Sequence, residues 1–192
     1  NTLHLYFGDE YEDGKKVYFK TADSKAVYGM RKDKITFMDT KAFDIVDKFT
    51  YIVNIDNVDK IIVEGGGKTH TLTLERTVKK AEKEGEEDEE ITTYFVDGKE
   101  VEEKPFKKYY QSLIGILADA ENNKELEGNP EVKTTFFLNV GKEREVHINY
   151  VPYDNDFYAV FRGGKAEFLV YKGQVKNTLD TLEALINGEL EA

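Results

Sequence analysis

The sequence contains no cysteine and no tryptophan, and it has only three prolines and three histidines. Without cysteine the chain can form no disulfide, no zinc–thiolate site and no thiol nucleophile. No stretch approaches the roughly 18 apolar residues that a membrane helix needs, and no signal-peptide pattern is present. The lack of cysteine does not assign a compartment, because many bacterial surface proteins also have none.

Basic residues are too few to balance the acidic ones. There are 27 Lys and Arg against 38 Asp and Glu, which gives a formal net charge of −11. This charge repels nucleic-acid phosphates and anionic lipid headgroups, and so argues against both as partners. The 192 residues are 40% hydrophobic, enough to bury a core as one domain or two small ones. Because the chain begins at Asn1 with no methionine, and already at a predicted strand, we expect an upstream segment to have been removed.

Residues 91–120 show most clearly a strand followed by a helix. Alternation over residues 91–95 predicts the strand, Asp97 and Gly98 predict a turn, and Pro105 fits the first position of the helix. The helix has one apolar face, which predicts burial against a sheet. That face consists of Phe106, Tyr109, Tyr110, Leu113, Ile116, Leu117 and Ala120.

Two other parts of the chain show the same order of strands and then a helix. Asp39 or Thr40 can cap a first helix that carries Phe43, Val46 and Phe49. Asn177 is the expected cap of the last helix, with Gly188 at its end. The remaining predicted strands are residues 3–7, 16–21, 26–31, 35–38, 61–63, 69–77, 135–140, 145–151, 157–161 and 166–171.

These patterns predict an α+β fold, in which antiparallel sheets are built from three repeated β-β-β(-β)-α units and the helices pack on one face. Residues 121–130 form the clearest boundary. We therefore expect two units in residues 1–128 and a third in residues 129–192, or one continuous domain. Residues 54–59 resemble a linker, and residues 79–90, almost entirely Lys, Glu and Asp, predict a solvated acidic loop.

The glycine-rich stretch Gly65 to Thr69 resembles the end of a phosphate-binding loop. The first glycine of that motif would fall on Ile62, and a strand rather than a helix follows Thr69. Phosphate binding in such loops needs a helix N-terminus directed at the anion. We therefore predict a hairpin turn.

The histidines and the acidic clusters do not predict a metal site. His4 and His147 are expected opposite their apolar neighbours, whereas His70 shares a face with Leu72, so the three histidines do not converge. The two acidic groups lack the spacing, the central glycine and the distal glutamate of a calcium loop, and we interpret them as polar turns. They are Asp56, Asn57 and Asp59, and Asp154, Asn155 and Asp156.

No catalytic, cofactor-binding or metal-binding residue is predicted. The only serines, Ser24 and Ser112, are placed in a turn and in a helix, and neither has the strained turn of a nucleophile elbow. Acidic residues are abundant enough to supply a glycosidase-type pair, and the 12 tyrosines could line a sugar-binding face. Packing in the core or across strands is the alternative for most of the tyrosines.

The sequence resembles the bacterial family called domain of unknown function 4340 (DUF4340). The stretches that carry the resemblance are residues 17–19, 26–30, 58–63, 72–76, 93–98 and 106–120. The resemblance implies an extracytoplasmic protein with a membrane or lipid anchor, in some members associated with ABC-transporter or gliding-motility components. It implies no active-site residue.

Two functional hypotheses follow from these observations. The first is a non-enzymatic extracytoplasmic binding or scaffold module of a membrane-anchored bacterial protein, accessory to an ABC-transporter complex, with a protein partner at the cell surface and no cofactor. The second is a carbohydrate-binding or hydrolytic domain that uses acidic and tyrosine residues in a cleft between units. Binding demands fewer special residues than catalysis, which favours the first hypothesis.

Overall fold

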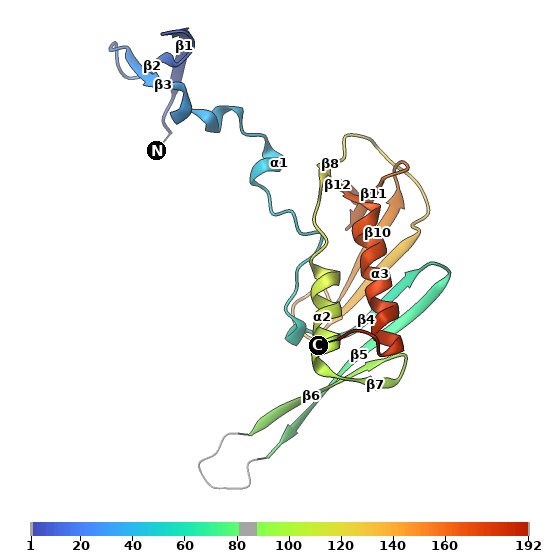
Figure 1. Cartoon of the computed structure of the whole chain (residues 1–192). Helices are drawn as coiled ribbons and strands as arrows, with labels where there is room; N and C mark the ends of the chain where they lie inside the picture. The colour runs from blue at the N-terminus through green and yellow to red at the C-terminus, as the bar shows by residue number, and fades with distance from the viewer. Residues whose placement is uncertain (1, 81–87, 192) are drawn as a thin grey trace. The chain divides into compact units, whose positions relative to one another are not determined.

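The structure is a computed structural model that describes residues 2–80 and 88–191. The chain divides into two compact units, Asn1–Val46 and Asp47–Ala192. The first unit has a three-stranded sheet and the second a nine-stranded sheet (Figure 1), and all strand pairs are antiparallel. The α+β class is therefore as predicted. The expected division between residues 128 and 129 falls inside the second unit. Strands from before and after this position pair with each other in the same sheet.

The first unit is a strand meander with few buried side chains. Its sheet has the order β1-β2-β3. Phe7, Phe19 and Tyr28 are cross-strand neighbours in adjacent strands, and their rings lie 5.5 to 6.3 Å apart. The elements are β1 (Leu5–Tyr11), β2 (Lys16–Thr21), β3 (Tyr28–Arg31), the short 3-10 helices η1 (Lys32–Lys34) and η2 (Thr36–Asp39), and α1 (Ala42–Ile45).

Two predictions in this part of the chain were wrong. Residues 35–38 are not a strand, because local turns satisfy their backbone: Ile35 N–H donates to Lys32 O, and Thr40 N–H to Phe37 O. The helix expected around residues 40–49 is limited to α1, and Phe49 instead forms a β-bridge with Leu117 in the second unit. An alternation over only four residues could not distinguish these outcomes.

The second unit is built on a sheet with the order β7-β6-β5-β4-β9-β10-β11-β12-β8. The segment before β4 contains η3 (Ile55–Asn57). The strands are β4 (Val58–Gly65), β5 (Lys68–Lys79), β6 (Glu89–Val96), β7 (Lys99–Val101), β8 (Ala120–Glu121), β9 (Val132–Leu138), β10 (Glu145–Pro152), β11 (Phe157–Arg162) and β12 (Lys165–Tyr171). Most of the predicted acidic loop, residues 81–87, lies outside the described part of the chain.

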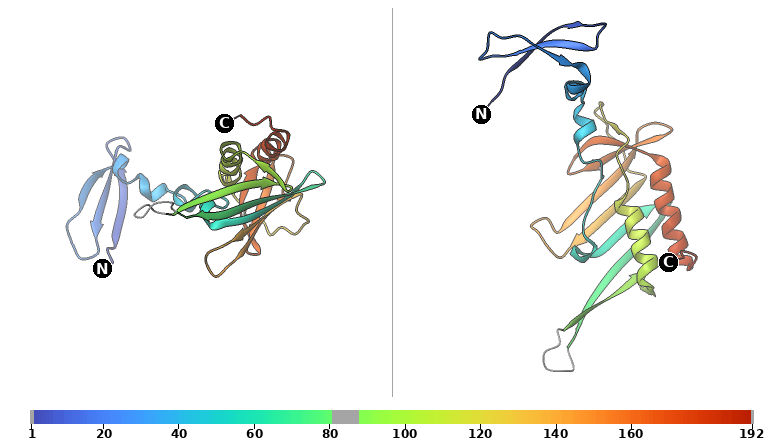
Figure 2. Two further views of the ribbon diagram at one scale, coloured as in Figure 1. Left: turned by 90° about the horizontal axis from the view of Figure 1, so that it is seen from below. Right: turned by 60° about the vertical axis from the view of Figure 1, so that its left-hand side comes forward.

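Helices α2 (Glu103–Ile114) and α3 (Lys172–Asn187) both pack on the same face of this sheet, as Figure 2 shows. Most of the predicted apolar stripe is buried, with Phe106 and Tyr109 at 0% exposure, but Leu117, which lies beyond the end of α2, is 41% exposed. Alternate residues of the strands face the helices, since successive side chains of a strand point to opposite faces. The hydrophobic core extends from Tyr51 to Leu185 and lies entirely in the second unit.

The helix ends differ in part from the prediction. Helix α2 ends at Ile114 rather than Ala120, because residues 116–118 bond to residues 48–50 and Ala120 pairs in β8. Helix α3 begins at Lys172, five residues before the expected cap at Asn177. Gly188 ends α3 in the left-handed conformation, as predicted, with a φ of 73°.

The threefold repeat is not established by this architecture. Each half of the larger sheet consists of four consecutive strands and then a helix: β4 to β7 with α2, and β9 to β12 with α3. Residues 1–46 contain three strands in a separate sheet, and their helix spans only four residues. None of the helices in the described residues is both long and apolar enough to cross a membrane.

Candidate functional site

The glycine-rich turn and the two serines considered as candidate sites form local turn and helix hydrogen bonds. The β4–β5 connection is the expected hairpin, since Gly65 pairs with Lys68 and both Gly66 and Gly67 have positive φ. Ser24 accepts a hydrogen bond from the backbone of Ala26 in a turn. Ser112 donates to Tyr109 O within α2.

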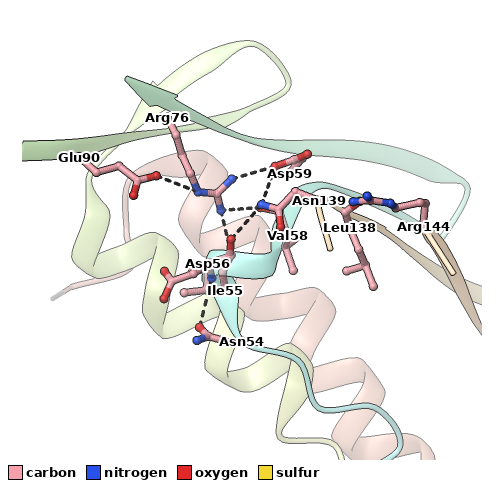
Figure 3. A network of polar contacts seen from close by, with 10 residues as sticks. All are labelled: Asn54, Ile55, Asp56, Val58, Asp59, Arg76, Glu90, Leu138, Asn139 and Arg144. Atoms are coloured by element: carbon pink, nitrogen blue, oxygen red, sulfur yellow. Dashed lines mark hydrogen bonds and ion pairs between the residues drawn. The ribbon is translucent and has the colours of Figure 1, made fainter. Parts of the chain in front are cut away.

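The linker-like residues before β4 form an ordered polar network (Figure 3). The guanidinium of Arg76 donates to Asp59 Oδ1 at 2.8 Å and to the carbonyls of Ile55 and Val58 at 3.1 and 2.8 Å. Asn139 donates from its side chain to Asp56 O and to Asp59 Oδ1. This acidic group is therefore a polar turn, as predicted.

The second acidic group is also a turn, in which Asp154 Oδ1 accepts from the backbone N–H groups of Asp156 and Phe157. Within residues 2–80 and 88–191, no three His, Cys, Asp or Glu side chains are placed to hold a metal ion.

His70 lies on the helix-covered face, as predicted, and is hydrogen-bonded to Asp97. Its Nδ1 is 2.7 Å from Asp97 Oδ2, and its buried Nε2 lies 3.7 Å from Glu183 Oε1 on α3. Burial opposes ionisation of Asp97, but hydrogen bonds from His70 and from the Thr71 N–H outweigh it and lower the pKa of Asp97. Lys68 Nζ is 2.7 Å from Glu183 Oε1.

This cluster resembles a catalytic pair only in part. A histidine oriented by a carboxylate can act as a general base towards a nearby hydroxyl or thiol. The described partners of His70 are Asp97 and Glu183, and both are carboxylates. We therefore interpret the cluster as a polar connection between the β6–β7 turn and α3.

Five of the tyrosines belong to the core, which agrees with the packing alternative for them. Burial raises the pKa of Tyr150 to about 12 and raises the pKa values of Tyr51, Tyr109 and Tyr110. Tyr110 donates its hydroxyl to Val53 O at 2.8 Å. The five are Tyr51, Tyr94, Tyr109, Tyr110 and Tyr150.

Two other tyrosines line a cavity at the N-terminal end of α3, which we call the tyrosine cavity. Its volume is about 660 Å³, within the range of small-ligand sites. Its apolar lining includes the buried Val132 and Val175 and the partly buried Leu179. Tyr158, Tyr171 and the β4–β5 turn also line it. The cavity thus brings residues from both sides of the expected boundary at 128/129 together.

The polar groups of the tyrosine cavity hold the ring of Tyr158. The Tyr158 hydroxyl donates to Glu131 Oε2 at 2.9 Å, and Lys172 Nζ lies 4.9 Å from the centre of the Tyr158 ring. Burial, and the bond to Glu131, raise the pKa of Tyr158 to about 12. The phenol is therefore neutral at physiological pH and can act as a hydrogen-bond donor.

Tyr171 is 50% exposed, and its ring lies against the backbone of α3. A Cβ atom at Gly173 would lie 2.4 Å from Tyr171 Cε1, so the absence of a side chain at Gly173 makes room for this ring. Phe157 contacts Tyr171 edge to face, with ring centres 6.1 Å apart. Both aromatic walls of the cavity are therefore positioned by neighbouring groups.

A second concavity, of about 640 Å³, lies beside residues 47–52, and we call it the strap cleft. The ring of Tyr51 lies 4.7 Å from Arg162 Cζ and 4.9 Å from the ring of Phe136. Glu143, Glu145 and His147 also line this cleft, and His147 Nε2 is 3.2 Å from Glu145 Oε1.

Sequence reasoning identified abundant tyrosines but not the tyrosine cavity. Tyr158 and Tyr171 were assigned to strands, and the start of α3 was placed too late to bring Lys172 and Gly173 to the cavity. The available signal was Gly173, a residue without a side chain that stands two positions after Tyr171.

No family model, curated protein or solved structure matches this chain.

Proposed function

We propose that this protein is a binding module that does not perform catalysis. The observation that carries the proposal is the tyrosine cavity: an apolar floor, two positioned tyrosine rings, and one acidic and two basic side chains at its edge. Preformed apolar concavities with a few placed polar groups are the usual form of a ligand site. The His70 cluster, with carboxylates as its described partners, adds no hydroxyl or thiol nucleophile to this site.

The binding proposal is tested by NMR chemical-shift mapping of the full chain with small probes such as indole. Probes should perturb the backbone amides of Gly66, Gly67, Val132 and Lys172. Tyr171→Ala should weaken these effects, whereas Tyr28→Ala should not, although Tyr28 in the first unit is equally exposed at 50%. If no probe perturbs the cavity amides, or if both variants behave alike, the proposal fails.

Carbohydrate binding is a second candidate, and one arrangement favours it. Tyrosine rings can pack against the C–H face of a sugar, and Glu131 beside Tyr158 can accept hydrogen bonds from sugar hydroxyls. A titration with cellotetraose tests this candidate. Hydrolysis is not supported, because Glu131 is the only acidic residue among the described residues that line the cavity, and glycosidases use two carboxylates.

We also propose that the full-length protein is anchored outside the cytoplasm, where it serves a transporter complex. The support is the resemblance to DUF4340. Fractionation of cells that express the full-length protein tests this location, because recovery in the soluble cytoplasmic fraction would contradict it.

We further propose that the strand-and-helix unit is the building block of the whole chain. It is complete in residues 58–114 and 132–187, and residues 5–45 have a shorter form of the same order.

A further inference from the structure

The two halves of the larger sheet are related by an approximate twofold arrangement. In sheet order the strands run β7-β6-β5-β4 and then β9-β10-β11-β12, so the halves meet at their first strands. These two strands, β4 and β9, are antiparallel, as a twofold axis perpendicular to the sheet requires. Each half continues from its fourth strand into a helix, α2 or α3, on the same face.

The two helices correspond residue by residue. At one constant offset in residue number, three buried positions of α2 match three buried positions of α3: Phe106 with Val175, Tyr109 with Thr178, and Leu113 with Leu182. The same offset pairs Tyr110 with Leu179. The β4–β5 turn likewise corresponds to the β9–β10 turn.

In the first half, the segment before β4 lies between α2 and the β9–β10 turn. Tyr110 on α2 donates its hydroxyl to Val53 O. Asn139, which directly follows β9, donates from its backbone to Asn57 O and from its side chain to Asp56 O. The side chains of Val53 and Ile55 pack against the core. A short segment, which is extended at Asn54 and turns in η3, is therefore bound at this position.

In the second half, the segment before β9 takes a different course. Residues 126–130 lie near His147, Asn149 and Phe161. Along β10, His147 and Asn149 alternate with the buried Val146 and Ile148, so they lie on the face away from the helices. The groups that correspond to Tyr110 and to the β9–β10 turn, Leu179 and the β4–β5 turn, instead line the tyrosine cavity.

We propose that the tyrosine cavity binds a short peptide segment of a partner protein, in the manner in which residues 53–57 bind beside α2. The inference rests on the proposed binding function and names its ligand class. Val175 and Leu179 receive an aliphatic side chain of the peptide. Lys172, which forms no ion pair with a carboxylate in the described part of the chain, favours an acidic residue next to this side chain, whereas Lys176 is paired with Asp180 on α3.

The segment bound in the first half has the same chemistry. Ile55 is partly buried against the core, and the acidic Asp56 follows it. A synthetic peptide with the sequence of residues 50–57 is therefore a suitable probe. The matched control peptide carries Val53→Asp and Ile55→Asp, which removes the two aliphatic side chains that pack against the core in the first half.

The test is a titration of the isotope-labelled full chain with each peptide, followed by NMR. The probe peptide should cause saturable shifts at Gly66, Gly67, Val132 and Lys172, and the control peptide should not. Leu179→Arg should weaken binding by about tenfold or more, because it places a charge on the apolar floor. Val78→Arg also introduces an arginine charge in place of an aliphatic side chain, but on β5 at a site that is 65% exposed, and it should have no effect.

Lys172→Glu is a second variant that leaves the floor intact, and it should also weaken binding if the acidic residue meets Lys172. Shifts confined to the neighbours of residues 48–57 would show exchange with the chain's own segment and would overturn the inference. If indole or cellotetraose perturbs the cavity amides and the peptide does not, the peptide inference fails and the binding function stands. If none of the probes perturbs them, both fail.

Discussion

Tyr109 and Tyr110 are adjacent in α2 but differ in one hydrogen bond. Both are buried, yet the Tyr109 hydroxyl has no partner among the described residues, whereas Tyr110 donates to Val53 O. Tyr109→Phe should raise the free energy of unfolding by about 1 kcal/mol, and Tyr110→Phe should lower it by about as much. Urea unfolding of the two variants measures this. Equal effects with the same sign would contradict the assignment of the hydrogen bonds.

Asp97 predicts a pH dependence at the residue scale. Its pKa in the folded protein lies below the ordinary value of 3.8. Asp97 therefore stabilises the fold at pH values above its unfolded pKa, and this contribution is lost as the pH falls through the lower folded pKa. The difference in unfolding free energy between wild type and Asp97→Asn should be largest near pH 6 and shrink below about pH 4.

Asparagine suits this comparison because Asp97 has a φ of 52°, a conformation that asparagine tolerates. Glu100→Gln, on the exposed surface of β7, is the control, and it should show no comparable change between these pH values. A difference for Asp97→Asn that grows as the pH falls would show that the sign of the pKa shift is wrong.

At the scale of elements, Arg76 anchors the β5–β6 hairpin to the segment before β4. Its side chain is 18% exposed and bonds two carbonyls and Asp59. Arg76→Met should lower the free energy of unfolding by about 2 kcal/mol, because the carbonyls of Ile55 and Val58 lose their charged donor. Arg144→Met, which removes only one 3.4 Å contact to Leu138 O, should cost less than about 0.5 kcal/mol.

The two variants of this pair can also be compared by amide hydrogen exchange. Arg76→Met should increase exchange in residues 54–58, and Arg144→Met should not. Unchanged exchange in both variants would show that the segment before β4 does not depend on this guanidinium.

Elements that depend on local residue preferences could be predicted from the sequence, whereas elements that depend on distant contacts could not. The turns at Asp97-Gly98 and Gly66-Gly67 follow from residues that favour positive φ, and the buried stripe of α2 follows from its period. The early start of α3 depends instead on distant groups: Asp119 Oδ2 accepts from Tyr171 N–H, and Lys172 N–H donates to Asp156 O. Sequence periodicity contains no information on such contacts.

The candidate site was unpredictable for the same reason. It is formed by the β4–β5 turn, the first residue of β9, β11 and the start of α3, which come together only through the pairing of β4 with β9. The stretch that the sequence suggested as a boundary, residues 121–130, connects β8 to β9 within one sheet. The tyrosine content suggested aromatic sites, yet the five core tyrosines have the same residue type as those of the cavity.

At the scale of the whole molecule, the core lies in residues 51–185, and Val17 and Ile35 are the only buried hydrophobic side chains among the described residues of the first unit. A fragment of residues 47–192 should therefore fold alone, with the unfolding free energy of the corresponding transition of the full chain. A fragment of residues 58–192 lacks Tyr51, Val53 and Ile55, together with the Tyr110 hydrogen bond, and should be less stable by about 3 kcal/mol or more.

Urea unfolding of both fragments, with NMR spectra to establish their folds, measures this difference. If residues 58–192 are as stable as residues 47–192, the segment before β4 contributes little to the fold. Its position beside α2 would then be a poor guide to what the tyrosine cavity binds beside α3. If instead residues 47–192 fail to fold, the first unit supplies stability that its two buried hydrophobic side chains do not account for.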